Sequence, residues 1–219
     1  MAVPKMKVSV LDTPSGPFSF NAPVLSTQTL TGVAAPNQWT MKWTFVVASL
    51  DVSRVVSRFQ TTFGYLGGES NRAQNIRRAA SQVDGVVLMP GELISFNHLV
   101  GPRSEDNGFA TAPEIYKGEM REGVGGGTCQ VAGTLHAAAF FAGLEILERA
   151  NHSRPSGYIR MGLDATVVYP TVDLKLRNPY PFPLVVRATV DRGTLAFELL
   201  GQEQPASVEL STATIGVAP

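Results

Sequence analysis

The sequence predicts an α+β fold in which two principal helices accompany a mainly antiparallel sheet. Two segments repeat apolar residues at helical spacing, and the second half of the chain carries short apolar segments separated by turn residues. The resulting order, β, α, β, loop, α and then many strands, is typical of this fold class. Apolar residues make up 44% of the 219 residues and charged residues 16%, which is enough apolar material for a buried core.

The first helix is predicted over residues 71–83. The hydroxyl of Ser70 can cap its start, and apolar side chains recur at helical spacing while the arginines face outward. The recurring apolar positions are Ala73, Ile76, Ala80 and Val83.

Extended segments are predicted on both sides of this helix. Residues 39–50 are rich in valine, threonine and aromatic residues, which favours a strand. After the helix, Asp84-Gly85 turns the chain into a strand over 86–89, and a second extended stretch follows over 93–96. Residues 101–126 are polar and glycine-rich, so we expect a long surface loop of the kind that often carries function.

The second helix is predicted directly after three consecutive glycines, in Gly125-Gly-Gly-Thr-Cys129. Thr128 is the expected N-cap and Gly143 suits a left-handed stop. Four apolar residues between them share one helical face: Val131, Leu135, Ala138 and Ala142.

Beyond this helix the chain is predicted to form strands over 144–149, 165–169, 172–177, 184–190 and 195–200. Asp191-Arg-Gly193 is the expected hairpin turn between the last two. We divide the chain into an irregular or β N-terminal appendage (1–58), a main domain (59–201) and a C-terminal tail (202–219).

The composition argues against several classes of function. Lys plus Arg and Asp plus Glu each number 18, so the basic excess typical of nucleic-acid binding is missing. No run approaches the roughly 20 apolar residues of a membrane-spanning helix, and no signal peptide is recognisable. One cysteine and three scattered histidines lack zinc-ligand spacing, so we expect neither a metal nor a cofactor.

Cys129 is the candidate nucleophile, because it lies in the first turn of a helix that follows a glycine turn. A thiol with a pKa of about 8.5 is ~3% ionised at neutral pH, and about 1 kcal/mol from a helix terminus raises this fraction to about 14%. A basic partner, most naturally a histidine, is therefore expected as well. The alternative is that this lone cysteine is a small buried hydrophobe.

Among the three histidines, His152 is the predicted base. His136 lies about 10 Å further along the helix than Cys129 and is expected to be a packing or surface residue. His98 is expected in a loop with nothing around it that indicates chemistry. His152 follows the strand after the cysteine helix, and that strand would return the chain to the helix N-terminus.

A carboxylate is expected to orient the imidazole. Asp164 is the first candidate and Asp173 a weaker one. The alternatives are an ordinary surface-turn histidine and an aspartate that merely begins a strand.

These residues occur within a series of motifs through which the chain, from about Phe59 to Gly201, resembles the VanW domain of bacterial proteins linked to vancomycin-resistance clusters and the cell envelope. The matching motifs are Asn71-Arg-x-x-Asn-Ile-x-x-Ala-Ala80, Asp84-Gly85, Pro90-Gly-Glu92, Ser95-Phe-Asn97, Val100-Gly-Pro-Arg103, Gly125-Gly-Gly-x-Cys-Gln130, Glu148-Arg149, His152-Ser153, Gly162-x-Asp-Ala-Thr-Val167 and Asp173-x-x-x-x-Asn178.

The resemblance implies a location in the cell envelope and an L,D-transpeptidase-like activity on peptidoglycan stem peptides, since some members of the family act in this way. Cys129 would attack the carbonyl before a terminal D-amino acid, and a second stem would accept the acyl group. Arg103 would anchor a stem carboxylate, with a structural salt bridge as its alternative. The expected substrate-binding residues are Gly125, Gly126, Gly127, Thr128, Gln130, Arg103 and Ser153.

Three hypotheses of function follow. The first is acyl transfer by Cys129 and His152, with N–H groups of the glycine turn stabilising the oxyanion. The second is hydrolysis by the same two residues. The third is a non-catalytic module for binding the cell wall or a glycopeptide.

Overall fold

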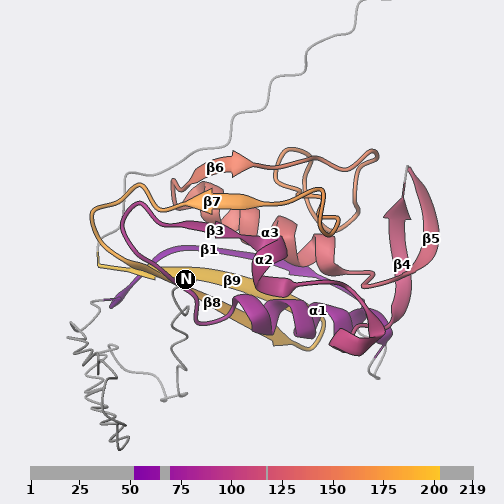
Figure 1. The fold of residues 1–219 in the computed structure, drawn as a ribbon. Coiled ribbons are helices and arrows are strands. Elements are labelled where there is room, and N and C mark those ends of the chain that lie inside the picture. The colour runs from indigo at the N-terminus through magenta and orange to yellow at the C-terminus, as the bar shows by residue number, and fades with distance from the viewer. Residues whose placement is uncertain (1–51, 65–69, 117, 203–219) are drawn as a thin grey trace, which may run out of the picture.

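The computed structural model describes residues 52–64, 70–116 and 118–202, and these form three antiparallel sheets with helices (Figure 1). The largest sheet has the order β1-β9-β8-β2, with strands Arg54–Thr62, Thr194–Gly201, Leu184–Asp191 and Val87–Leu88. The second has the order β3-β7-β6, with strands Leu93–Ser95, Lys175–Arg177 and Glu145–Glu148. The predicted α+β class with mainly antiparallel pairing is confirmed.

The two predicted helices are present as α1 (Asn71–Val83) and α3 (Thr128–Phe141), and a short α2 (Phe96–Val100) lies between them. Ser70 caps α1 as predicted, since its Oγ accepts a hydrogen bond from the Ala73 N–H at 3.2 Å. The four predicted apolar positions of α1 are all buried. Gly143 ends α3 with a φ of 72°, again as expected.

Helix α3 is buried on every side rather than along one face. It packs on β1 and β9 of the large sheet, on α1, and on β6 of the second sheet. Every residue from Thr128 to Ala139 is buried except Cys129. Small residues make this possible, because five of these positions are alanine or glycine and let neighbouring elements approach closely. The expectation of a single apolar face was therefore too narrow.

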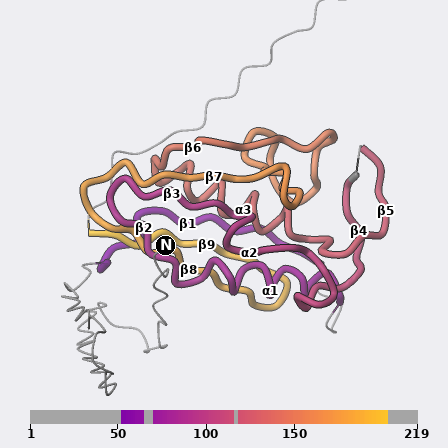
Figure 2. Tube along the Cα trace, in the orientation of Figure 1, coloured from indigo at the N-terminus to yellow at the C-terminus, as the bar shows by residue number. Residues whose placement is uncertain are grey.

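The segment over residues 101–126 is not the long loop that was expected. A 3₁₀ turn (Glu105–Asn107) is followed by a hairpin of β4 (Thr111–Tyr116) and β5 (Glu119–Val124). The hairpin stands apart from the other two sheets at one end of the molecule (Figure 2). It brings a wall of side chains next to the start of α3.

Two predicted strands are largely irregular instead. The segment predicted as a strand over 165–169 forms only isolated bridges, Ala150 with Thr166 and Val168 with Val172. The strand predicted over 172–177 is reduced to β7. Residues 93–96 form the short β3 and the first residue of α2, so His98 lies in a helix and not in a loop. The hairpin turn at Asp191-Arg-Gly193 is confirmed between β8 and β9.

The predicted strand over 39–50 and nearly all of the predicted tail lie outside the described residues. Strand β1 begins at Arg54 and pairs along its length with β9, so the large sheet includes residues that the sequence analysis placed in the N-terminal appendage. Among the residues described, no helix combines the length and apolar character needed to cross a bilayer.

Candidate functional site

A pocket of about 590 Å³ opens beside the N-terminus of α3. One wall is the glycine turn with the first residues of the helix, and the β4–β5 hairpin forms a second. Segments 154–158 and 166–169 form the remainder, together with Arg72, Arg103 and His152. Of the sequence-predicted site residues, the structure brings Cys129, His152, Arg103, Thr128, Gln130 and the three glycines to this pocket, whereas Ser153 and Asp164 do not line it.

Neighbouring atoms pack so closely on the turn over residues 125–127 that side chains larger than glycine would not fit there. A Cβ at Gly126 would lie 2.5 Å from the carbonyl oxygen of Ala112 in β4, and a Cβ at Gly125 would lie 2.7 Å from Cβ of Arg103. Gly127 has a φ of 108° and is the N-cap of α3, while Thr128 is the first helical residue and makes no capping hydrogen bond with its side chain. Thr128 was therefore wrongly predicted as the cap.

Replacing Gly126 by alanine is expected to lower the free energy of unfolding by about 3 kcal/mol, because the new methyl group would overlap backbone that cannot move freely. Chemical denaturation measures this directly. Gly157→Ala is the matched control, since a Cβ there meets nothing within 4 Å, and it should change stability by less than about 0.5 kcal/mol. Equal losses in both variants would show that the turn is not packed in this way.

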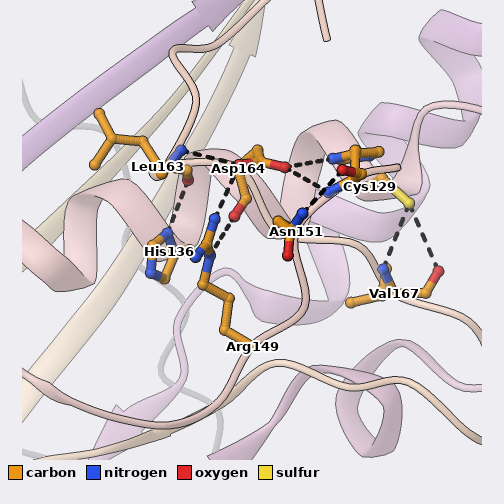
Figure 3. A network of polar contacts seen from close by, with 9 residues as sticks. Cys129, His136, Arg149, Asn151, Leu163, Asp164 and Val167 are labelled. Carbon is orange, nitrogen blue, oxygen red and sulfur yellow. Dashed lines mark hydrogen bonds and ion pairs between the residues drawn. The ribbon is translucent and has the colours of Figure 1, made fainter. Parts of the chain in front are cut away.

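Cys129 is the second residue of α3 and is only partly buried. Its Sγ lies 3.5 Å from the backbone N of Val167, which donates to it, and 3.6 Å from the Val167 carbonyl oxygen, as Figure 3 shows. Burial raises the pKa of the thiol, and this outweighs the lowering by the Val167 N–H and by the guanidinium groups of Arg103 and Arg72. The thiol is therefore protonated at neutral pH and requires a base.

The alkylation rate of Cys129 by iodoacetamide should reflect this elevated pKa. The rate is expected to rise with pH through a midpoint above the value of about 8.5 that is usual for a free thiol. Arg103→Gln should move the midpoint higher still, because it removes a positive charge that favours the thiolate. Glutathione serves as the reference thiol, and because the chain has one cysteine all labelling reports on this residue. A midpoint below that of glutathione would contradict the assignment.

His152 and Asp164 form the predicted pair. The Asp164 Oδ2 accepts hydrogen bonds from His152 Nδ1 at 2.8 Å and from the His152 backbone N–H at 2.7 Å. The other carboxylate oxygen accepts from Arg149 Nη2 and from the Gly162 N–H (Figure 3 shows Asp164 with Arg149). Although burial alone would raise it, the two hydrogen bonds from His152 and the Arg149 charge hold the pKa of Asp164 below its usual value.

The ring of His152 is thereby fixed in one orientation. Because the ionised Asp164 can only accept, Nδ1 carries the proton and Nε2 is left as the acceptor in the neutral ring. The His152 side chain is 5% exposed, and the residue lines the pocket. Within the described part of the chain no hydrogen bond joins its ring to Cys129, so the two groups face a common space rather than each other.

The other two histidines have structural or peripheral positions. His136 is buried in α3, and its Nδ1 lies 2.8 Å from the carbonyl oxygen of Leu163 (Figure 3). Burial lowers the pKa of His136, which keeps the ring neutral as part of the core. His98 is exposed on α2. Asp173, the weaker candidate carboxylate, instead accepts hydrogen bonds from Ser95 Oγ, from the Asn97 N–H in α2 and from the Leu174 N–H.

Two of the predicted substrate-binding residues have defined roles within the fold, and a third lies outside the pocket. The Gln130 side chain accepts from Arg72 and donates to Thr61 and Thr62, so it joins α3 to α1 and β1. Arg103 stacks over the Phe96 and Tyr169 rings at 5.4 and 6.0 Å from their centroids. Ser153 is exposed outside the pocket. The structural salt bridge that was the alternative for Arg103 is not found among the described residues.

Sequence reasoning missed several polar residues of the pocket, and four of them bear on its chemistry. The first is Arg72, which was expected to face outward with the other arginines of α1 but lines the pocket and hydrogen-bonds to Gln130. The others are Ser156 and Tyr158, whose buried hydroxyl groups interact with each other, and Thr166, whose buried hydroxyl oxygen has no hydrogen-bond partner in the described residues. The Tyr158 ring packs edge-on against His152. A signal for Arg72 was available, since it follows the cap residue Ser70 within the first turn of α1.

The pocket thus contains a thiol, a carboxylate-bound imidazole and backbone N–H groups without partners. In the described residues, the N–H groups of Gly126, Gly127 and Cys129 make no hydrogen bond. A thiol, an orienting carboxylate–imidazole pair and unpaired N–H donors are the groups that covalent acyl chemistry requires.

The family model and one of two curated relatives carry the same family name. The family model described as "VanW like protein" matches residues 71–200. The chain is 41% identical over 133 residues to "Uncharacterized protein YoaR" of Bacillus subtilis (strain 168). The aligned residues cover 61% of this chain and 44% of that protein. It is 27% identical over 142 residues to "Vancomycin B-type resistance protein VanW" of Enterococcus faecalis (strain ATCC 700802 / V583). The aligned residues cover 63% of this chain and 52% of that protein. The chain therefore spans about half the length of these curated relatives. No solved structure matches.

Proposed function

The chain belongs to the VanW-like protein family, and from this premise we propose that it is a cell-envelope cysteine acyltransferase acting on peptidoglycan stem peptides. The observation that supports the proposal is the shared pocket. Cys129, the only residue between Thr128 and Ala139 that is not buried, opens into the same pocket as the carboxylate-bound His152. A residue kept only as a small core hydrophobe would not need this exposure.

In the proposed reaction, Cys129 Sγ bonds to the carbonyl carbon of the last amide of a stem peptide, and the C–N bond of that amide breaks. The thiol proton passes to His152 Nε2 and then to the leaving amine of the terminal D-amino acid. An amine of a second stem attacks the resulting thioester, forms a new amide and returns a proton to the sulfur. Since Cys129 and His152 share no hydrogen bond, a water or the substrate itself carries the proton between them.

The glycine turn would stabilise the oxyanion of each tetrahedral intermediate. The Cys129 N–H lies on the residue that attacks, and the Gly126 and Gly127 N–H groups precede it without partners in the described residues. The small residues therefore serve two purposes. They allow Arg103 and β4 to pack closely, and their N–H groups would be the donors for the oxyanion.

The test is to incubate the protein with a synthetic stem tetrapeptide that ends in a D-amino acid, with and without an acceptor amine. Intact-protein mass spectrometry should show an adduct equal to the peptide without its last residue, and peptide analysis should show joined peptides when the acceptor is present. Release of only the shortened free acid in the presence of acceptor would indicate a hydrolase. The absence of any adduct or product would leave a binding module and overturn the proposal.

A further inference from the structure

Two arginines flank the thiol on opposite ends of the glycine turn. A Cβ on Gly125, the first glycine, would lie 2.7 Å from Cβ of Arg103, and a Cβ on Gly127, the third glycine, would lie 3.3 Å from Cγ of Arg72. The aliphatic parts of the two side chains thus pack on the turn that carries Cys129. Both residues line the pocket, and the positive charge of each lowers the thiol pKa.

Neither guanidinium has a carboxylate partner in the described residues. Arg103 donates from Nη1 to the Gly101 carbonyl oxygen at 2.8 Å, and its Nη2 is buried without a partner. Arg72 donates to two neutral oxygens, Gln130 Oε1 at 2.8 Å and the Pro113 carbonyl at 3.4 Å. Burial lowers the pKa of both arginines, so holding the two charges here costs solvation energy.

The one carboxylate that lines the pocket does not neutralise them. Glu114 of β4 is paired with Arg121 across the hairpin, with 2.8 Å between Glu114 Oε1 and Arg121 Nε. Arginines that support the fold elsewhere do have acidic partners, as Arg149 has Asp164 and Arg177 has Glu145. Arg72 and Arg103 are therefore two partly buried positive charges of the pocket with which no carboxylate of the described residues forms an ion pair, although the charge of Asp173 raises the pKa of Arg103.

We propose that the pocket selects an acyl donor with two carboxylates, one on each side of the amide that Cys129 attacks. One guanidinium binds the carboxylate of the leaving residue, and the other binds a carboxylate on the acyl part that remains attached to the sulfur. The hydroxyl group of Thr166, buried without a partner among the described residues, is available to the peptide groups between them. This inference rests on the proposed function and specifies its donor substrate.

Binding to the Cys129→Ser chain tests the inference without turnover. The probes are a stem tetrapeptide with a free terminal carboxylate and a second carboxylate on the acyl side of the last amide, and its two monoamides. Isothermal titration should show that amidation of either carboxylate weakens binding at least tenfold. Arg72→Gln and Arg103→Gln should each weaken binding of the dicarboxylate to a similar degree.

The decisive result is the pairing between variants and probes. For each arginine variant there should be one monoamide that it binds as tightly as the Cys129→Ser parent binds that same monoamide, because amidation has already removed the carboxylate that this arginine contacts. The monoamide should be a different one for Arg72→Gln and for Arg103→Gln. Arg160→Gln is the matched control, since Arg160 is an exposed arginine that does not line the pocket, and the substitution should change binding less than twofold. Thermal unfolding of each variant, with Arg72→Lys beside Arg72→Gln, separates loss of contact from loss of fold.

The inference is overturned if the monoamides bind as tightly as the parent peptide, if both arginines pair with the same carboxylate, or if no peptide binds. Failure of the proposed function has a different signature. In that case the Cys129→Ser chain would bind the dicarboxylate with the expected pairing, while the unaltered protein would form no thioester with it.

Discussion

Replacing Cys129 by alanine is expected to abolish both the covalent adduct and the joined product, while a stem peptide still binds. The loss should be complete within detection, at least a thousandfold in rate, because no other thiol exists in the chain to take over the nucleophilic step. Mass spectrometry of the protein and of the peptide products measures both outcomes. Peptide binding should persist because Arg72, Arg103 and the hairpin wall of the pocket are unchanged.

Stability provides the control for this experiment. Cys129 is partly exposed and its sulfur contacts only the Val167 backbone by hydrogen bonding, so alanine should lower the free energy of unfolding by no more than about 1.5 kcal/mol. A folded alanine variant that still transfers at the parental rate would remove Cys129 from the chemistry. A variant that loses binding together with transfer would instead assign the sulfur to substrate recognition.

The parts of the fold that the sequence predicted well are those set by local chemistry. The start of α1 follows from a hydroxyl that can reach the third N–H after it, and the stop of α3 follows from a glycine able to adopt a positive φ. The hairpin between β8 and β9 is similarly marked by its turn residues. In each case the signal and the structure that it specifies lie within a few residues of each other.

The β4–β5 hairpin escaped prediction because few of its side chains face the core. Most of the β5 side chains are exposed, so the hairpin shows no alternation of apolar and polar residues, and its two strands are paired through backbone groups that any sequence supplies. The irregular segment over 165–169 shows the opposite case. Its valines and alanine suggested a strand, but Ala165 and Val167 are buried against the core without a partner strand.

The part of the candidate site that could be predicted consists of residues close to one another in sequence. His152 follows β6, which returns the chain from the C-terminal end of α3, and Asp164 reaches it through a contact between residues only 12 apart in sequence. Arg72 was not predictable in this way. It lies 57 residues from Cys129, and its approach depends on the missing side chain of Gly127, which is visible only when the two segments are packed together.

Asp164→Asn is the second substitution with a large expected effect. All four groups that contact the carboxylate are hydrogen-bond donors: the His152 N–H, His152 Nδ1, Arg149 Nη2 and the Gly162 N–H. An amide nitrogen in place of one oxygen would face a donor and leave the Arg149 charge without its counter-charge. We expect a loss of about 3 kcal/mol in the free energy of unfolding, measured by denaturant titration at neutral pH.

The same substitution should slow acylation of Cys129 by two orders of magnitude or more. An amide nitrogen facing His152 would favour the tautomer with the proton on Nε2, and that ring nitrogen could then no longer accept the thiol proton. His136→Gln is the control histidine variant, because His136 contacts Leu163 in the core and should affect stability far more than the rate per folded molecule. If Asp164→Asn acylates at the parental rate, His152 is not the base.

The pH dependence of the free energy of unfolding distinguishes the contribution of the Asp164 charge from the contribution of its packing. The pKa of Asp164 is lower in the folded chain than its usual value of about 3.9, so the folded state favours the ionised form. Its stabilisation is therefore fully present above about pH 4 and is lost as the pH falls through the folded-state pKa. The difference in stability between the parent and Asp164→Asn should consequently shrink as the pH falls below about pH 4. A difference that does not change with pH would mean that the carboxylate acts through its packing alone and that its charge does not hold the His152 ring.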